Sequence, residues 1–304
     1  MRCFNIFGKD IPIREYGCSN KGNPPLYIKT PRFNIFIQLT NNCNANCPFC
    51  IYHSSEQKTF DLGKLSYIIK YLHQNADIGK INFTGGEPTL NLDLFYNVVE
   101  CVSENIVKLR KPEITLNTNG INLLDVLPIS SFLDSIGLSR HHYDDEINNK
   151  IFNCSTVATK DIISEFQSKV KNKNLIQLRC NLISGYIDCY DEILKYLNHS
   201  IDMGCHDCGF VTLMPNNDFC LNHQVDFPRL MHEDENIIEV DSWTRDDDKT
   251  KECVCRCSNY IYQNENGEFC RFYRRHFCRN NLTEGQLVYD GQNLRYGFGG
   301  EIII

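Results

Sequence analysis

The sequence predicts an α/β fold: a partial (β/α)6 TIM-like barrel over residues 33–215, followed by a small cysteine-rich β-hairpin module over residues 216–304. Two observations lead to this prediction. Short apolar, β-rich runs alternate six times with segments whose apolar residues recur at helical spacing, and the connections between them are short. After Pro215 the alternation stops, and a polar, irregular stretch leads into short strands and turns that are rich in cysteine.

The expected elements follow in order along the chain. Residues 1–32 contain prolines, glycines and short apolar runs, which indicate a lead-in with one hairpin. The six expected strands are residues 33–40, 80–84, 113–118, 133–139, 175–183 and 209–214. The expected helices are residues 61–76, 92–109, 121–127, 145–152, 159–172 and 188–204. Six such units indicate a parallel sheet that is closed fully or partly into a barrel.

The segment after Pro215 has a different pattern. Residues 216–251 are polar and irregular, with an acidic run at 246–248. Turn sequences at 264–267 and around Asp290-Gly291 lie between β-rich stretches, so they predict two hairpins. Because this segment follows the sixth strand, we expect it to rest over the open rim of the barrel.

Composition excludes several classes of protein. The chain has 304 residues, of which 42% are hydrophobic and 11% aromatic, and its mean hydropathy is −0.36. These values exclude a disordered chain and a membrane bundle. No apolar run approaches the ~18 residues that a membrane helix needs, and the N-terminal residues lack a signal-peptide pattern. We therefore expect a cytoplasmic protein with no membrane partner.

The charge balance argues against general nucleic-acid binding. The chain carries 31 basic and 38 acidic residues, a net charge of −7. Proteins that hold a polyanion by neutralising many phosphates usually have a basic excess. A small anionic substrate held by a few local arginines is compatible with this balance.

The seventeen cysteines are the unusual feature of the composition. In a reducing compartment thiols stay free, and several of these cysteines are expected to be ordinary core residues. Cys43, Cys47 and Cys50 form a C-x3-C-x2-C motif directly after the first strand. Thiolates favour zinc or iron–sulfur clusters, and three of them without an obvious fourth suggest a [4Fe–4S] cluster with one open iron. The alternative is a zinc knuckle completed by His53 or a distant cysteine.

A second motif, Gly85-Gly86-Glu87-Pro88, directly follows the second strand. The two glycines would let a ligand approach the backbone closely. Glu87 could accept hydrogen bonds from an ammonium group. The tetrapeptide alone is a common turn, and its place at the end of the strand after the cysteine motif makes it informative.

The two motifs together, FIQLTNNCNANCPFC and INFTGGEP, resemble the radical S-adenosylmethionine (SAM) superfamily over roughly residues 33–215. The resemblance implies that Cys43, Cys47 and Cys50 hold a [4Fe–4S] cluster whose fourth iron SAM chelates. It further implies reductive cleavage of SAM to methionine and a 5′-deoxyadenosyl radical, which abstracts hydrogen from a substrate. A reductant such as flavodoxin or ferredoxin would then be a partner.

The resemblance also implies SAM contacts at the later strand ends. Asn117 and Asn119 match the family's polar motif after strand three, and Ser139 matches the polar ligand after strand four. Arg179 and Asn181 match the basic-x-Asn pair on strand five, and Met214 lies where strand six approaches the adenine. The chain departs from the commoner Ser-Leu-Asp-Gly sequence after Ser139, so Arg140 could face the SAM carboxylate or the substrate. The resulting SAM-binding candidates are Gly85, Gly86, Glu87, Asn117, Asn119, Ser139, Arg140, Arg179, Asn181 and Met214; the alternative for each later one is an ordinary barrel-interior residue.

A third group of cysteines lies near the C-terminus, on either side of a predicted hairpin turn. Its members are Cys253, Cys255, Cys257, Cys270 and Cys278. The group resembles the half-size, twitch-type module of the molybdenum-cofactor GTP cyclases, which implies an auxiliary [4Fe–4S] cluster; the C-x2-C-x5-C-x3-C ending of the larger SPASM module is absent. The alternative is a zinc site or unligated thiols. The neighbouring Arg271, Arg274, Arg275 and Arg279 could clamp a phosphate or carboxylate, or form a solvated basic strand.

The sequence therefore predicts a radical SAM enzyme that acts on a small molecule, a nucleotide or a peptide. The GTP-cyclase-like module favours a nucleotide or other small metabolite, while auxiliary clusters are also common in enzymes that act on peptides. The alternative class is a non-catalytic iron–sulfur electron carrier or a zinc-stabilised binding scaffold. The GGEP motif and the ordered strand ends argue against both, because a carrier needs no SAM pocket.

Overall fold

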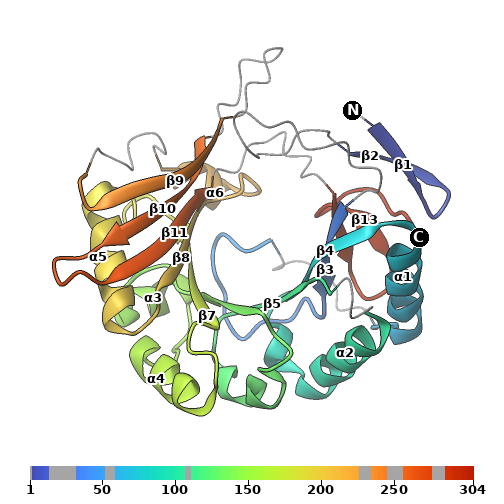
Figure 1. Ribbon diagram of the computed structural model, residues 1–304, viewed down its shortest axis with the longest axis horizontal. Coiled ribbons are helices and arrows are strands. Elements are labelled where there is room, and N and C mark those ends of the chain that lie inside the picture. The colour runs from blue at the N-terminus through green and yellow to red at the C-terminus, as the bar shows by residue number, and fades with distance from the viewer. Residues whose placement is uncertain are drawn as a thin grey trace.

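The computed structural model (Figure 1) describes most of the 304 residues. The described ranges are 2–13, 32–51, 59–106, 111–225, 234–244, 256–275 and 285–304.

Six parallel strands form the centre of one curved sheet, as the sequence predicts (Figure 1). They are β3 (Arg32–Gln38), β4 (Asp77–Thr84), β5 (Glu113–Thr118), β6 (Ser135–Ser139), β7 (Ile176–Leu182) and β8 (Asp207–Thr212). Each pairs in parallel with the next along the chain. The sheet bends into an open arc, which confirms the partial barrel.

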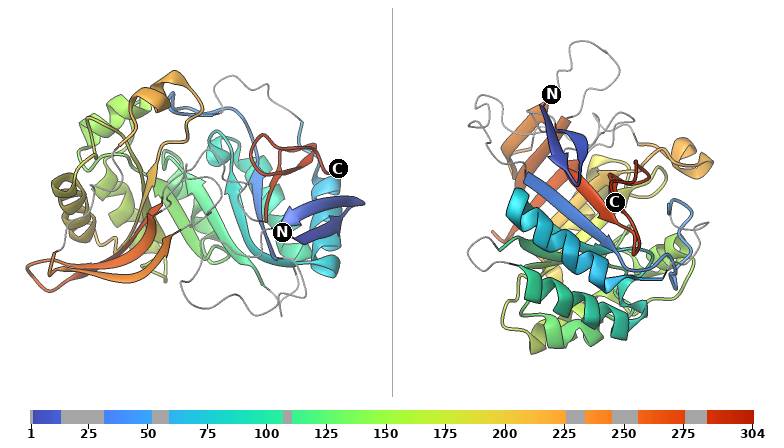
Figure 2. Two further views of the ribbon diagram at one scale, coloured as in Figure 1. Left: turned by 90° about the horizontal axis from the view of Figure 1, so that it is seen from above. Right: turned by 90° about the vertical axis from the view of Figure 1, so that its right-hand side faces the viewer.

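Helices cover the outer, convex face of the arc (Figures 1 and 2). They are α1 (Leu62–Asn75), α2 (Leu92–Asn105), α4 (Thr159–Lys169) and α5 (Tyr190–Asp202), with the 3-10 turns η1 (Pro88–Leu90) and η3 (Leu123–Ile129). The helices α3 (Asp145–Phe152) and α6 (Asp218–Asn222) reach the loop after β3 instead: the Asn46 N–H donates to the Phe152 carbonyl, and the Asn217 Nδ2 donates to the Pro48 carbonyl. The side chains of Asp61, Asn91 and Asp144 cap the first backbone N–H groups of α1, α2 and α3. The segment expected as a helix at 121–127 is the 3-10 turn η3, which contains Pro128; proline cannot donate the hydrogen bond that an α-helix interior needs.

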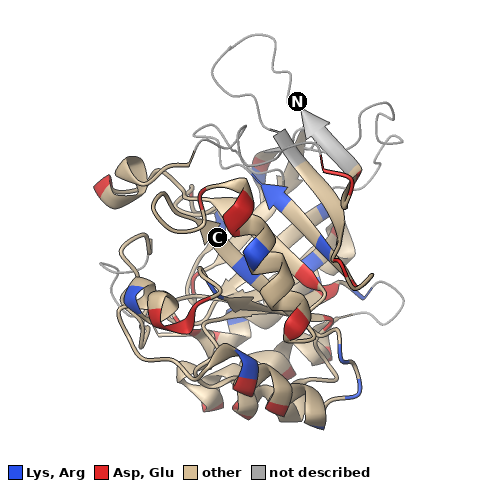
Figure 3. Ribbon diagram, turned by 90° about the vertical axis from the view of Figure 1, so that its left-hand side faces the viewer, with Lys and Arg blue, Asp and Glu red and all other residues tan. Residues whose placement is uncertain are grey.

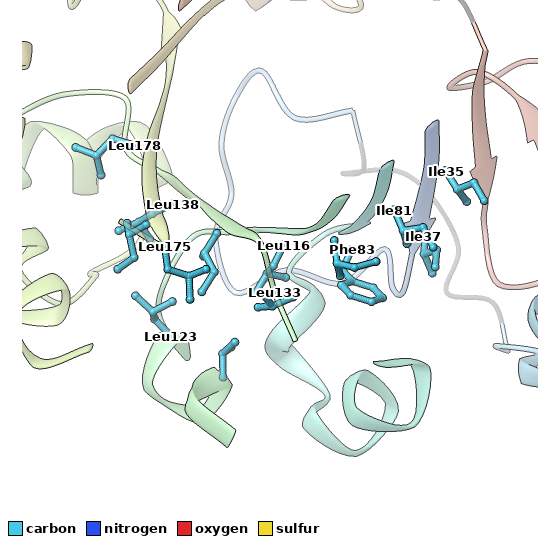
Figure 4. Packing of buried hydrophobic residues seen from close by; sticks show 14 of the residues in the cluster. Ile35, Ile37, Ile81, Phe83, Leu116, Leu123, Leu133, Leu138, Leu175 and Leu178 are labelled. Atoms are coloured by element: carbon cyan, nitrogen blue, oxygen red, sulfur yellow. The ribbon is translucent and has the colours of Figure 1, made fainter. Parts of the chain in front are cut away.

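The two faces of the sheet differ in polarity. The side chains of Ile81 and Phe83 on β4 and of Leu116 on β5 are fully buried in the hydrophobic core, and Figure 4 shows them packed together with further aliphatic residues. The alternate residues on β4, Lys80 and Asn82, line the hollow inner side instead. The stabilising apolar layer therefore lies between sheet and helices, and β4 presents polar side chains to the inside of the arc.

The C-terminal strands belong to the same sheet. They are β9 (Ile237–Thr244), β10 (Arg256–Gln263), β11 (Phe269–Arg275), β12 (Gln286–Tyr289) and β13 (Leu294–Tyr296). Both predicted hairpins form, β10 with β11 and β12 with β13. However, β11 pairs in parallel with β8, and β12 pairs in parallel with β3.

The expectation that this segment forms a module of its own over the rim is therefore corrected. Strands β3 and β8 would otherwise be the edges of the six-stranded arc, with one row of backbone N–H and C=O groups unpaired. β12 and β11 pair with those edges, so the described sheet runs in the order β13-β12-β3-β4-β5-β6-β7-β8-β11-β10-β9. Strand β9 also lies within residues 216–251, which the sequence indicated as irregular.

The two ends of the chain meet on one side of the molecule. The predicted N-terminal hairpin forms from β1 (Arg2–Ile6) and β2 (Lys9–Ile13). The Lys9 ammonium donates to the carbonyl of Ile302, and both views place the termini near α1 (Figures 1 and 2). On the side drawn in Figure 3, basic and acidic residues are interspersed over the described elements. The part of the chain that the structure describes contains no helix with the length and apolarity to cross a membrane.

The shared sheet predicts that the C-terminal hairpin and the barrel unfold together. Phe272 of β11 is 3% exposed, and its ring contacts Phe210 of β8 and Tyr260 of β10 at centroid distances of 6.0 and 4.9 Å. Phe272→Ala should lower the free energy of unfolding by about 3–5 kcal/mol in a single transition, measured by urea denaturation. Phe269→Ala, on the same strand but 52% exposed, should change it by less than about 0.5 kcal/mol. Separate transitions for hairpin and barrel would contradict the shared sheet.

Candidate active site

A cavity of about 400 Å³ lies inside the arc, at the carboxyl ends of the parallel strands and in the space below them. Barrels of this kind place their active sites at this end. The candidates from the sequence that line the cavity are Cys43, Cys47, Cys50, Gly85, Gly86, Glu87, Asn117, Asn119, Ser139, Arg179 and Asn181. The structure thus brings together residues from five different strand ends.

The three cysteines of the first motif lie on the loop after β3. A turn closes between them, since the Cys50 N–H donates to the Cys47 carbonyl at 3.0 Å. The Ala45 N–H donates to the Cys43 Sγ at 3.3 Å. Burial raises the pKa of the Cys43 and Cys47 thiols, and the neighbouring cysteine sulfurs raise both further.

Three thiols on one partly buried loop suit an iron–sulfur cluster. Three thiolates that lie close together repel one another, so a cationic group between them is needed to stabilise their charges. Sulfur is a soft donor that favours iron–sulfur clusters or zinc. Among the described residues no three His, Cys, Asp or Glu side chains are already arranged to hold a metal ion. Within the described residues the loop supplies three sulfur donors at one cavity wall, and His53, the fourth ligand in the zinc alternative, lies outside the described residues.

The glycines of the second motif line the cavity and also make a close backbone contact. A Cβ on Gly85 would lie 2.4 Å from the Thr40 carbonyl oxygen, and one on Gly86 would lie 2.1 Å from the Asn42 carbonyl oxygen. The Gly86 and Glu87 N–H groups donate to these same carbonyls at 2.7 and 2.9 Å. The glycines thus permit close contact with the backbone that leads into the cysteine loop, and so join the two motifs.

The Glu87 carboxylate is buried, with 1% of the residue exposed. Its Oε1 accepts from the Thr89 N–H and hydroxyl at 3.1 and 2.5 Å and from the Thr118 hydroxyl at 2.7 Å. Its Oε2 accepts from the Asn119 N–H at 2.7 Å. Burial raises the pKa of Glu87, while these hydrogen bonds act to lower it. A carboxylate oxygen has about two acceptor positions, so Oε2 has one left for a further donor.

Asn119 connects the end of β5 to the cysteine loop. Its Nδ2 donates to the Asn44 Oδ1 at 2.7 Å and lies 3.8 Å from the Cys43 Sγ. Its carbonyl accepts from the Arg140 Nη1 at 2.7 Å. Asn119 therefore contributes to the position of the loop as well as to the cavity wall.

Arg179 is on β7, across the cavity from β3, the strand that precedes the cysteine motif. It pairs in register with Ser139 of β6. Its guanidinium stacks on the ring of Tyr273 from β11, 4.9 Å from the centroid. A Cβ on Gly209 would lie 2.4 Å from the Tyr273 Cζ and 2.8 Å from the Arg179 Nη1, so only glycine leaves room for both. The Nη1 atom is buried and has no hydrogen-bond partner, which makes it available to an anionic ligand.

Arg140 does not line the cavity. It is 1% exposed, and its guanidinium donates to the Asn119 and Ser139 carbonyls and to the Thr159 hydroxyl at 2.7–2.8 Å. Side chains alternate across a strand, so the residue after Ser139 turns to the helix side. Its prediction as a SAM or substrate contact is therefore corrected to a structural role. Met214 lies beyond the end of β8, and it too is absent from the cavity wall.

The C-terminal cysteine group is only partly described. Cys253, Cys255 and Cys278 lie outside the described residues, and Cys257 is on β10 with its side chain undescribed. Cys270 is fully buried, with its Sγ 3.7 Å from that of Cys208. This is the core beside α5, on the other face of β11 from Tyr273, so Cys270 is a packing residue and its prediction as a metal ligand is corrected.

The arginines of the same region have separate environments. Arg271 pairs with Asp207 at 3.1 Å. The Arg274 Nη2 donates to the Tyr260 hydroxyl at 3.2 Å inside the core. Arg275 stacks on the Tyr273 ring, 4.7 Å from its centroid, so Tyr273 has contacts with two guanidinium groups. Arg279 lies outside the described residues.

Sequence reasoning gave no role to His141, which lines the cavity. Its ring meets Phe49 and Phe152 edge to face at 4.9 and 5.2 Å, and its Nδ1 accepts from the Asn181 N–H at 3.0 Å. Burial, with the adjacent Arg140, lowers its pKa to about 3. The imidazole is thus neutral, with its proton assigned to Nε2. Its position two residues after Ser139, on the same face, is the signal that could have identified it.

Known proteins resemble this chain in sequence and in fold. Residues 37–197, just over half of the chain, match the family model of the radical SAM superfamily. A probable GTP 3′,8-cyclase of Saccharolobus islandicus is 28% identical over 189 residues, 61% of this chain and 58% of that relative. A putative glycyl-radical enzyme activating enzyme of Methanocaldococcus jannaschii is 29% identical over 171 residues, 53% of this chain and 62% of that relative. The matches thus span about three fifths of the length of these relatives.

Solved structures show the same fold. The structure of Streptococcus suis SuiB bound to S-adenosylmethionine has a TM-score of 0.52 and 14% identity, and covers 67% of this chain and 44% of SuiB. SuiB bound to its precursor peptide SuiA has a TM-score of 0.50 at 14% identity, covering 67% of this chain and 43% of SuiB.

The buried, neutral His141 predicts a pH dependence of stability. Its pKa is about 3 in the folded chain against an ordinary value of 6.5, so the unfolded chain takes up a proton first as pH falls. The free energy of unfolding should therefore decrease from pH 6.5 downward, by up to about 1.4 kcal/mol per pH unit from this group. His141→Leu should reduce that slope in urea titrations between pH 6.5 and 4.5, with the exposed His206→Leu as control. An identical slope in wild type and His141→Leu would contradict the prediction.

Proposed function

Because the chain belongs to the radical SAM superfamily, we propose that it cleaves SAM reductively and uses the 5′-deoxyadenosyl radical to abstract hydrogen from a substrate. The observation that carries the proposal is a single cavity lined by three thiols, by the Gly85–Glu87 loop and by the guanidinium of Arg179. An iron–sulfur electron carrier would have no use for the last two features.

In this proposal Cys43, Cys47 and Cys50 hold the [4Fe–4S] cluster that the family implies. A cluster held there would supply the electron that cleaves SAM. Asn119 and the Ala45 N–H lie at the Cys43 sulfur, where N–H donors stabilise a thiolate. A reductant such as flavodoxin or ferredoxin would deliver the electron.

The polar groups of the cavity support one orientation of SAM. The remaining acceptor position of the Glu87 Oε2 suits an N–H of the SAM amino group. The unpartnered Arg179 Nη1, beside Ser139, suits its carboxylate. Asn117 and Asn181 also line the cavity, and we assign them to the ribose of SAM.

We further propose an auxiliary [4Fe–4S] cluster on Cys253, Cys255, Cys257 and Cys278. With Cys270 in the core, four of the five predicted cysteines remain, and four is the number of protein ligands of a closed cubane. The similarity to GTP 3′,8-cyclases supports a nucleotide or other small molecule as substrate, and a peptide is the other candidate.

Replacement of Cys43, Cys47 and Cys50 by alanine tests both cluster assignments. The triple variant, reconstituted anaerobically, should form no 5′-deoxyadenosine from SAM and dithionite. Its iron content should fall by about four atoms per chain, and about four should remain on the auxiliary site. Undiminished 5′-deoxyadenosine formation would contradict the first assignment. Retention of zinc alone, or of no metal, would contradict the second.

Replacement of Arg179 by alanine tests the orientation of SAM. Loss of a charge-assisted hydrogen bond, typically about 1.5–3 kcal/mol, should weaken SAM binding roughly tenfold or more, measured by equilibrium dialysis of the reconstituted protein. Arg271→Ala, which removes an exposed arginine that pairs with Asp207 and does not line the cavity, is the control and should leave the dissociation constant unchanged. An unaltered constant in Arg179→Ala would place the carboxylate elsewhere.

A further inference from the structure

A row of small polar side chains crosses the inner face of the sheet, nearer the amino ends of the strands than Ser139 and Arg179. Asn82 of β4 pairs in register with Thr115 of β5, and Thr115 pairs with Ser135 of β6. All three line the cavity, and they are 7%, 3% and 5% exposed. We call these three residues the cavity floor.

The floor is built unlike an ordinary barrel interior. Bulky branched side chains normally fill these layers, and here small polar groups leave space. The Oδ1 of Asn82 and the Oγ1 of Thr115 are buried and have no hydrogen-bond partner within the protein. Buried oxygens without a partner destabilise a fold, so their retention points to a partner that is not part of the chain.

One cationic side chain lies beside the floor. Lys80, two residues before Asn82 on β4, lines the cavity. Its ammonium lies 3.1 Å from the carboxylate of Glu113, which is two residues before Thr115 on the same face of β5, and it has further N–H donors. Glu87, the one carboxylate among the described residues of the cavity wall, already accepts four hydrogen bonds. The ammonium of Lys80 thus has N–H donors left for a ligand anion, while the carboxylates of Glu87 and Glu113 already have partners.

We propose that Lys80, Asn82, Thr115 and Ser135 bind the substrate, and that the bound part is a small hydrophilic anion with hydroxyl or amine groups. The Asn82 Oδ1 can only accept, so the substrate presents an O–H or N–H there. The Thr115 and Ser135 hydroxyls both donate and accept, and Lys80 takes a carboxylate or phosphate oxygen. This inference rests on the proposed function and names its substrate class; an apolar or aromatic peptide side chain would leave the floor unsatisfied.

The first test uses the full chain as purified, without SAM. Thr115→Val keeps the side-chain shape and removes the unpartnered hydroxyl, so the thermal unfolding midpoint should rise by about 1–3 °C. Thr118→Val is the matched control on the same strand. Its hydroxyl donates to Glu87 and accepts from the Gly120 N–H, so its midpoint should fall. A decrease in Thr115→Val as large as that in Thr118→Val would show that the Thr115 hydroxyl is structural and would overturn the proposal.

The second test measures ligand binding to the reconstituted protein with SAM present and no reductant. The probes are GTP, ribose 5-phosphate and L-glutamate as anions, guanosine as a neutral counterpart, and a neutral capped pentapeptide of apolar residues. At least one anion should bind, and Asn82→Leu and Thr115→Val should each weaken its binding roughly tenfold. Three results would each overturn the proposal. They are binding of the peptide or guanosine alone, binding of no anion, and equal anion binding in wild type and variants.

The two tests separate this inference from the proposed function. If the anion binds through the floor and SAM is not cleaved, the proposed function fails and the binding site stands. If SAM is cleaved and the floor variants bind the anion as wild type does, the inference fails alone.

Discussion

The buried carboxylate of Glu87 is the contact on which the geometry of the site depends. A charge in the protein interior is stable only when donors surround it, and Glu87 receives four, from Thr89, Thr118 and the Asn119 backbone. These bonds tie the end of β4 to the end of β5. Asn119 then reaches Asn44 in the cysteine loop. The position of three thiols is thus controlled by a residue that touches none of them.

The order of the strands could be predicted from the sequence because each βα unit is a local pattern. The site at the strand ends followed, since parallel strands place their carboxyl ends together. The place of the C-terminal hairpins could not be predicted in this way. Strand β11 joins the sheet by pairing with β8, some sixty positions earlier in the chain. Its own residue pattern would be the same if β10 and β11 formed a separate hairpin, so the sequence near β11 does not reveal this pairing. Tyr273 was missed for this reason, whereas the direction of Arg140 follows from simple alternation after Ser139.

The polarity of the sheet separates stability from chemistry. Apolar residues such as Phe83 and Leu116 pack against the helices, so most of the hydrophobic stabilisation lies outside the arc. The inner face carries Asn82, Thr115 and Arg179, which contribute little to that layer. Substitutions inside the arc can therefore change what the cavity accepts while the fold is retained, which is how one barrel serves many reactions.

The pairing of β11 with one edge of the arc and β12 with the other has a consequence for synthesis on the ribosome. The six central strands are complete by Thr212, yet both outer strands of that arc keep an open row of backbone groups until residues 256–296 have emerged. Open strand edges pair readily with other chains. A nascent chain stalled between these points is therefore the species most prone to aggregate, and the cell's chaperones would be needed chiefly during that interval.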